Sequence, residues 1–176
     1  MFDLAAIRYR PEEASDLDAI DIITDEAFGP GRYTRAAERV RELAAYDPAL
    51  SYVADFSGEI VGSVRQTKIR VGNAPALMLG PLAVRPFLKG RGIGKALMRR
   101  AAQGATEAGE TVILLVGDQP YYWGLGYRPV PPGTIHLPDW ADGEWLTPAP
   151  SSAPRERCSD VTAVTAAAHA ADTAYA

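Results

Sequence analysis

The sequence has few of the residues on which several classes of site depend. Among its 176 residues there is one cysteine, Cys158, and there are two histidines. One cysteine cannot close an intrachain disulfide, and it cannot supply the several thiolates of a cysteine-based zinc cluster. We therefore name no metal-ligating residues and expect no disulfide.

Long apolar runs and an excess of positive charge are also missing. No apolar run approaches the roughly 18 residues of a membrane-spanning helix, and the first ten residues carry Asp3, Arg8 and Arg10 where a secretory signal is apolar. The formal net charge is −4, without the basic excess typical of nucleic-acid-binding proteins. We expect a cytoplasmic protein with neither membrane nor nucleic acid as partner.

The composition that remains is that of one globular domain. Hydrophobic residues make up 47% and charged residues 23% of the chain, which is enough to bury a sizeable core. Three prolines fall within residues 148–154, and residues 161–176 are rich in alanine with little else apolar. We expect a domain over residues 1–147 and a Pro/Ala-rich tail over residues 148–176, either disordered or weakly helical.

Hydrophobic periodicity predicts an alternation of strands and helices. Helices are expected over residues 16–28, 34–45 and 93–108, with a short one at 121–125. Strands are expected over residues 7–10, 50–56, 59–70, 76–84, 111–116, 127–130 and 134–137, with a loop over 71–75. The run 76–84 is almost wholly apolar, which is typical of a strand covered on both faces. This order predicts an α/β fold with a sheet covered by helices.

The strongest local signal is a glycine-rich loop between a predicted strand and a predicted helix. It consists of Lys89, Gly90, Arg91, Gly92, Ile93, Gly94 and Lys95. Backbone N–H groups at a helix start have no intrahelical acceptor, and together with the helix dipole they favour an anion. Glycine removes side chains that would block a close approach. The loop therefore favours a phosphate-binding site, and the alternative is a glycine-rich helix start that binds no ligand.

Two common phosphate loops do not fit this stretch. A Walker loop needs glycine where Lys89 stands and serine or threonine where Ala96 stands. A dinucleotide fingerprint counted from Gly90 needs glycine or alanine where Lys95 stands, and it normally follows the first strand of a fold. A nucleotide-phosphate binder remains a minor alternative.

The loop resembles the pyrophosphate loop of the GNAT acetyltransferase superfamily, in which Gln or Arg is followed by two residues, Gly, one residue and Gly or Ala. Gly92 and Gly94 take the glycine positions, and Lys89 replaces the usual Gln or Arg while keeping the positive charge. The similarity extends from about residue 7 to residue 130. It implies a mixed, mostly antiparallel central sheet flanked by helices, with acetyl-CoA as co-substrate bound at residues 89–95 and no metal.

The strand before the loop is similar to the family's strand that splays away from its neighbour. The matching run, residues 79–84, is followed by Pro86. The resemblance implies that main-chain groups of Leu82, Ala83 and Val84 pair with the amides of pantetheine, which is reasonable because an unpaired strand edge offers donors and acceptors.

A second motif resembles the family's closing segment, in which a tyrosine lies four residues before a Gly-Phe or Gly-Tyr pair. Tyr122 takes that position ahead of Gly126 and Tyr127. In many members this tyrosine protonates the departing CoA thiolate, so the resemblance implies that Tyr122 is the catalytic acid. Tyr121 is the competing donor if the register slips by one, and Tyr122 as a packing aromatic is the alternative.

The general base and the acceptor site are less defined. The predicted strand 76–84 contains no acidic residue, which leaves Glu26, Glu59 and His136 as candidates beside a water relay that needs no dedicated residue. By analogy with the family, the residues that face the acceptor are Phe28, Gly29, Arg32 and Tyr33.

The resemblance implies transfer of an acetyl group from acetyl-CoA to a primary amine by direct attack in a ternary complex. The acceptor would be a small molecule or a peptide, and the family pattern also allows a homodimer. The alternative is a noncatalytic acyl-CoA-binding or regulatory module on the same fold, which thioester turnover distinguishes from an enzyme.

Overall fold

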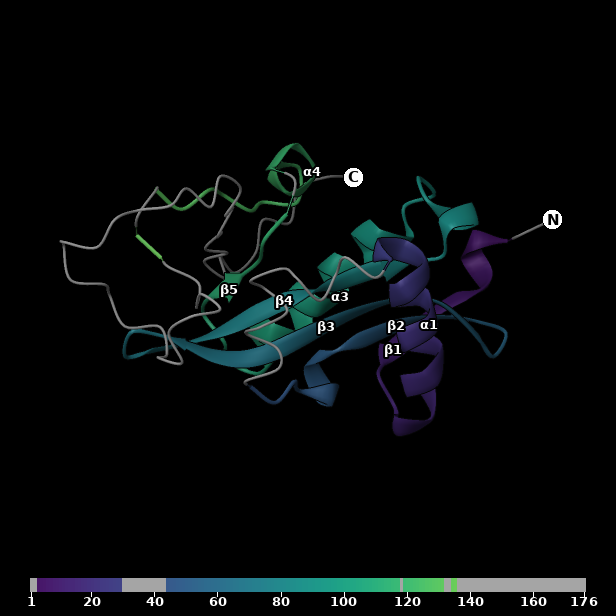
Figure 1. The fold of residues 1–176 in the computed structure, drawn as a ribbon, viewed down its shortest axis with the longest axis horizontal. Coiled ribbons are helices and arrows are strands. Elements are labelled where there is room, and N and C mark those ends of the chain that lie inside the picture. Colours follow the sequence, from purple (N-terminus) through teal and green to yellow (C-terminus); the bar gives the residue numbers. More distant parts are fainter. Residues whose placement is uncertain (1–2, 30–43, 118, 132–133, 136–176) are drawn as a thin grey trace.

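The computed structural model describes residues 3–29, 44–117, 119–131 and 134–135 (Figure 1). Its strands and longer helices follow the order β1 (Ile7–Pro11), α1 (Leu17–Phe28), β2 (Tyr52–Phe56), β3 (Glu59–Val71), β4 (Ala74–Val84), α3 (Ile93–Glu107), β5 (Ile113–Leu114) and α4 (Gln119–Trp123). Short 3-10 turns span Leu4–Ala6, Ala14–Asp16, Pro48–Leu50 and Pro86–Leu88. No helix in this described part of the chain is long and apolar enough to cross a membrane.

The strands form one mixed sheet in the order β1-β2-β3-β4-β5, which confirms the predicted fold class. The first four strands pair as antiparallel neighbours, and β5 joins β4 in parallel at only two register pairs, Leu77 with Ile113 and Met78 with Leu114. The β2–β3 hairpin turns at Ser57 and Gly58, whose φ angles of 54° and 92° suit a two-residue type I′ turn.

The sheet is covered by helices on both faces (Figure 1). α1 packs Ile20 and Ile23 against Val53, Ile60 and Ala83. α3 packs on the other face, in a cluster that draws on every strand; its members include Ile7, Tyr52, Ala54, Val61, Val64, Leu79, Ile93, Leu97, Met98, Ala101 and Ile113. Neighbouring residues of one strand therefore contribute to opposite clusters, as the alternation of a strand requires.

β4 contains a bulge that decides which of its side chains reach α3. Val64 pairs with Leu82 and Gln66 with Leu79, so Gly80 and Pro81 together stand opposite the single residue Arg65. The extra residue reverses the alternation of the strand from that point on. Leu77 and Leu79 before the bulge and Leu82 and Val84 after it consequently all pack on the α3 side of the sheet.

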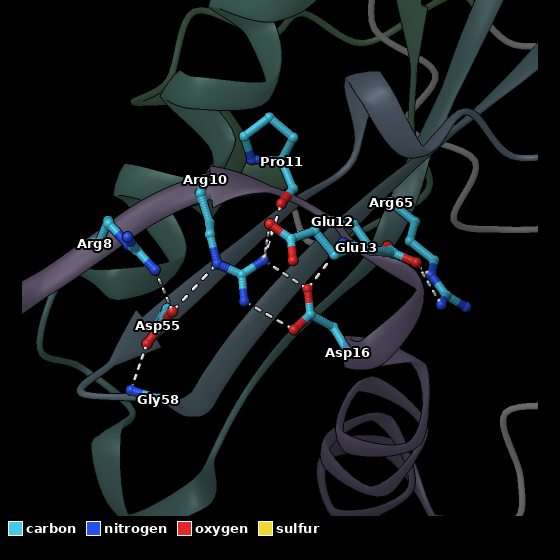
Figure 2. Close-up of polar contacts among 9 residues, drawn as sticks. All are labelled: Arg8, Arg10, Pro11, Glu12, Glu13, Asp16, Asp55, Gly58 and Arg65. Carbon is cyan, nitrogen blue, oxygen red and sulfur yellow. Dashed lines mark hydrogen bonds and ion pairs between the residues drawn. The ribbon is translucent and has the colours of Figure 1, made fainter.

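A network of ion pairs fastens β1 to its surroundings (Figure 2). The Arg10 guanidinium donates two hydrogen bonds to the Asp16 carboxylate, at 2.7 and 2.8 Å, and a third to Asp55 at 3.2 Å. Asp55 also accepts from Arg8 at 3.0 Å and from the Gly58 N–H in the hairpin turn at 2.8 Å. One guanidinium thus links the start of α1, β1 and β2.

A second ion pair joins the end of β1 to the middle of the sheet. Glu12, whose side chain is 1% exposed, accepts two hydrogen bonds from Arg65 at 2.8 and 3.1 Å. The Arg65 guanidinium also lies 4.6 Å from the centre of the Tyr46 ring, in a cation–π contact. Because both carboxylate oxygens are bonded, the buried charge of Glu12 is compensated.

Several expected elements differ from those observed. Residues 127–130 are not a strand, and neither are residues 134 and 135; Pro129 and Pro131 lack the N–H that a ladder needs. β5 is shorter than the expected 111–116 because its ladder to β4 ends at Leu114, although Leu115 stays buried in the core. The expected loop over 71–75 narrows to a two-residue turn at Gly72 and Asn73.

Some predicted segments lie outside the described residues. These are residues 34–43 of the predicted second helix, residues 136 and 137 of the predicted last strand, and the whole tail over 148–176. Ala44 and Ala45, which were expected to end that helix, are described and are not helical.

The Asp16–Arg10 pair gives folding a defined pH dependence. Hydrogen bonds from Arg10 hold the pKa of Asp16 below its usual value, so its stabilisation is complete above the unfolded-state pKa of about 4. That stabilisation decreases below this pH and is lost as the pH falls through the lower pKa of the folded state. We expect Asp16→Asn to cost about 1.5–3 kcal/mol of unfolding free energy at pH 7, and we expect that cost to shrink below about pH 4.

Urea unfolding between pH 7 and pH 3 measures this difference. Asp21→Asn, which removes an exposed carboxylate of α1, is the matched control and should stay within about 0.5 kcal/mol of the parent. A cost of Asp16→Asn that is the same at pH 3 as at pH 7 would contradict the assigned role.

Candidate functional site

A pocket of about 440 Å³ opens where the end of β4, the start of α3, the end of α1 and α4 meet. It is lined by eight of the residues that the sequence predicts for the cofactor, namely Leu82, Val84, Lys89, Gly90, Gly92, Ile93, Gly94 and Lys95. Its other walls come from Ala27 and Phe28 of α1, Leu88 of the preceding turn and Tyr121 of α4. The structure therefore brings most of the predicted binding residues together around one cavity.

The floor of the pocket is the N-terminus of α3. Gly90 and Gly92 have φ angles of 78° and 86°, a left-handed conformation that side-chain-bearing residues rarely adopt, and Gly92 is the residue that caps the helix. The first intrahelical bond runs from the Ala96 N–H to the Gly92 carbonyl at 3.0 Å. The N–H groups of the three residues between them therefore have no acceptor within the helix and suit an anion.

Positive side chains surround the same end of the pocket. Lys89 and Lys95 line it and are exposed, whereas Arg91 is exposed on the loop but does not line it. Neither lysine forms an ion pair with another described residue, so both can attract an anionic ligand, and the N-terminal end of the helix dipole is positive as well. The electrostatics of this end thus match a phosphate-bearing ligand.

The wall formed by β4 is open along one edge. The β4–β5 ladder ends at Met78 and Leu114, so within the part of the chain that the structure describes the following residues of β4 have no ladder partner on that side. Leu82 and Val84 turn their side chains into the pocket, while Ala83 packs on the opposite face against α1. Any contribution of Ala83 to a ligand would have to come from its main chain, as the sequence predicted.

The two adjacent tyrosines of α4 have different surroundings. Tyr121 lines the pocket, and burial raises the pKa of its phenol. Tyr122 is not among the lining residues; its half-buried ring packs against the core and lies edge-on to the rings of Tyr121 and Tyr127, with centroids 5.0 and 6.1 Å away. Tyr127 is buried in that core, and burial raises its pKa strongly.

Two of the candidate bases, Glu26 and Glu59, form ion pairs with the same arginine. Arg85, which follows β4, donates a hydrogen bond to Glu26 of α1 at 2.8 Å, and its Nε lies 3.7 Å from a carboxylate oxygen of Glu59. The same guanidinium therefore engages both carboxylates. His136, Arg32 and Tyr33 lie outside the described residues, while Phe28 lines the pocket and Gly29, with φ of 65°, ends α1.

Sequence reasoning missed two features of this site. The Gly80-Pro81 pair inside an apolar run was a usable signal for the β4 bulge, because both residues are unfavourable in regular strands. Arg85 carried no comparable signal, since its partners lie 59 and 26 positions away in the sequence.

Known proteins match this chain over the same region. The profile of the acetyltransferase (GNAT) family matches residues 17–125. An uncharacterised N-acetyltransferase of Escherichia coli, YjhQ, is 25% identical, with 84% of this chain and 90% of that protein covered. A GNAT family acetyltransferase from Brucella melitensis, solved with acetyl-CoA, is 29% identical with a TM-score of 0.58, covering 69% of this chain and 82% of that one.

A solved structure of lower identity adds to the evidence for the fold. The GNAT family N-acetyltransferase YhbS of Escherichia coli, solved with CoA, has a TM-score of 0.60 at 22% identity and covers 73% of this chain and 72% of its own. This likeness supports the arrangement of sheet and helices described above.

The close packing of Tyr122 generates a stability prediction. A Cβ on Gly117 would lie 2.3 Å from a ring carbon of Tyr122, so Gly117→Ala should displace the ring and cost about 1–3 kcal/mol of unfolding free energy. Gly124→Ala is the matched control in the same segment, because its nearest new contact is an ordinary 3.9 Å. Urea denaturation measures both variants, and equal stabilities would contradict the packing described for Tyr122.

Proposed function

Because this chain belongs to the GNAT acetyltransferase family, we propose that it transfers an acetyl group from acetyl-CoA to a primary amine of a small molecule or peptide. The observation that carries the proposal is the pocket that joins the free N–H groups at the start of α3 to the open edge of β4. The end at the start of α3 suits the pyrophosphate of CoA, and the end along β4 suits the amides of its pantetheine arm.

The comparisons support acetyl-CoA as the donor. The Brucella melitensis relative was solved with acetyl-CoA, and the residues that line the pocket here carry the family's glycine pattern. Lys89, Gly92 and Gly94 fit the pyrophosphate, and main-chain groups of Leu82, Ala83 and Val84 fit pantetheine. Arg91 stays in the proposal as an exposed cation beside the phosphates.

The proposed reaction is a direct displacement in a ternary complex. The neutral amine nitrogen attacks the thioester carbonyl carbon, a C–N bond forms, and the C–S bond breaks as the electron pair returns to sulfur. The CoA thiolate takes its proton from the Tyr122 hydroxyl. The surplus proton of the new amide passes to water, and water returns a proton to the Tyr122 phenolate. A water relay fits this site better than Glu26 or Glu59, since both carboxylates are paired with Arg85.

The first experiment is calorimetric titration with acetyl-CoA, with ATP and NAD as controls. Binding of acetyl-CoA alone, followed by thioester consumption in an amine screen, is the expected result. Binding without turnover on any amine would favour a noncatalytic acyl-CoA module. Binding of ATP or NAD in place of acetyl-CoA would overturn the cofactor assignment.

The glycine that caps α3 should be needed for CoA affinity. Gly92→Ala places a side chain at φ of 86° and beside the anion-binding N–H groups, so we expect CoA to bind about tenfold or more weakly. Gly109→Ala is the matched control, since Gly109 has φ of 79° just beyond the far end of the same helix. Both variants should lose a similar stability of about 1–2 kcal/mol. Equal CoA affinity in the two would rule out the loop as the pyrophosphate site.

Removal of one hydroxyl should separate turnover from binding. We expect Tyr122→Phe to lower kcat about 10²–10⁴-fold with little change in CoA affinity, because the phenol acts as charge develops on sulfur. Tyr127→Phe is the control, because the Tyr127 hydroxyl is buried without a hydrogen-bond partner among the described residues. Steady-state kinetics together with CoA titration make the measurement, and an unchanged kcat in Tyr122→Phe would exclude this role.

A further inference from the structure

We propose that the hydroxyl of Tyr121 is a ligand of the CoA pyrophosphate and not the proton donor to sulfur. The inference rests on the proposed function and divides two tasks between adjacent tyrosines of α4. Tyr121 would bind the anionic part of the donor, and Tyr122 would act at the thioester.

The position of the Tyr121 hydroxyl carries this assignment. An atom at the Cβ position of Gly94 would lie 2.9 Å from Tyr121 Oη, so the phenol reaches directly over the first turn of α3. Gly94 is the second glycine of the phosphate loop, and its N–H is one of the three without an intrahelical acceptor. The hydroxyl and these N–H groups therefore converge on the same end of the pocket.

The chemistry of the phenol suits an anion. Burial raises the pKa of Tyr121, so the hydroxyl keeps its proton at neutral pH and can donate it in a hydrogen bond. Among the described residues no hydrogen bond to this hydroxyl is made, so a bound phosphate oxygen would be its first partner. Lys89 and Lys95 line the same pocket and supply the charge that a neutral phenol lacks.

The same geometry argues against Tyr121 as the acid for sulfur. The predicted path of pantetheine follows β4 away from the start of α3, whereas Tyr121 Oη lies over that start. The rings of Tyr121 and Tyr122 lie edge-on with their centroids 5.0 Å apart, and only Tyr121 is among the residues that line the pocket at the start of α3.

Two acetyl donors separate the roles. S-acetylpantetheine lacks the pyrophosphate, so Tyr121→Phe should lower the ratio of kcat/KM for acetyl-CoA to that for S-acetylpantetheine about tenfold, mainly through KM and the Kd of CoA. Tyr122→Phe should lower kcat for both donors and leave that ratio unchanged. Tyr127→Phe should change neither quantity.

The outcomes are distinct. If Tyr121→Phe lowers kcat for both donors equally, Tyr121 acts at the thioester and the proposal is overturned. If Tyr121→Phe leaves the Kd of CoA unchanged, the hydroxyl is not a phosphate ligand. Failure of the parent protein to bind CoA at all would overturn the proposed function itself, which the titration of the parent reports separately.

A stability measurement tests the geometry without any ligand. Gly94→Ala should clash with the Tyr121 hydroxyl, while the next atoms, of Leu82 and Val84, lie at an ordinary 3.8 Å. In a Tyr121→Phe background the clashing oxygen is absent, so the same Gly94→Ala change should cost less unfolding free energy than in the parent. Equal costs in both backgrounds would show that the hydroxyl does not lie on Gly94.

Discussion

The arrangement of this protein depends on a requirement placed on β4, which has to fill the core along its first half and form a pocket wall along its second. A regular strand with this sequence would turn Leu82 and Val84 toward α1 if Leu77 and Leu79 faced α3. The bulge at Gly80 and Pro81 removes the conflict by reversing the alternation once. Both halves of the strand therefore present apolar side chains to the same helix.

The parts around β4 hold this wall in place from several directions. Arg85 binds the end of the strand to α1 and to the start of β3 through two carboxylates. Arg10 links β1, β2 and the turn before α1, which places α1 over the sheet and Phe28 at the pocket. α3 starts directly below the wall because Gly92 gives the chain a left-handed residue at the helix cap. The site therefore lies where the start of α3 meets the end of β4, and contacts outside the pocket hold both of these ends in place.

The sequence predicted those features whose signals are local. The glycine loop and α3 are set by glycine positions and by a helical period, and the structure places them as expected. Tyr127 and the residues after it were expected to form a strand, but the aromatic ring was buried as a core residue beyond the last turn of α4. In a short segment, hydrophobic periodicity cannot distinguish an apolar residue of a strand from an apolar residue that is buried in the core outside any strand. Arg85 acquires its partners from distant parts of the chain, so nothing near it in the sequence indicates a role. The sequence offered Tyr121 only as an alternative proton donor, because the position of its hydroxyl near Gly94 depends on the packing of distant segments.

The edge of β4 beyond Met78 also bears on how the protein behaves in a concentrated solution. A strand with unpaired main-chain groups is a place where a strand from another molecule can add and start aggregation. Here the edge is interrupted by Pro81, which has no N–H to offer, and by a bulge that breaks the regular spacing of donors and acceptors. An incoming extended chain would find no continuous ladder to match. The irregularity of this strand thus keeps its edge accessible to a small ligand while making it a poor template for another polypeptide.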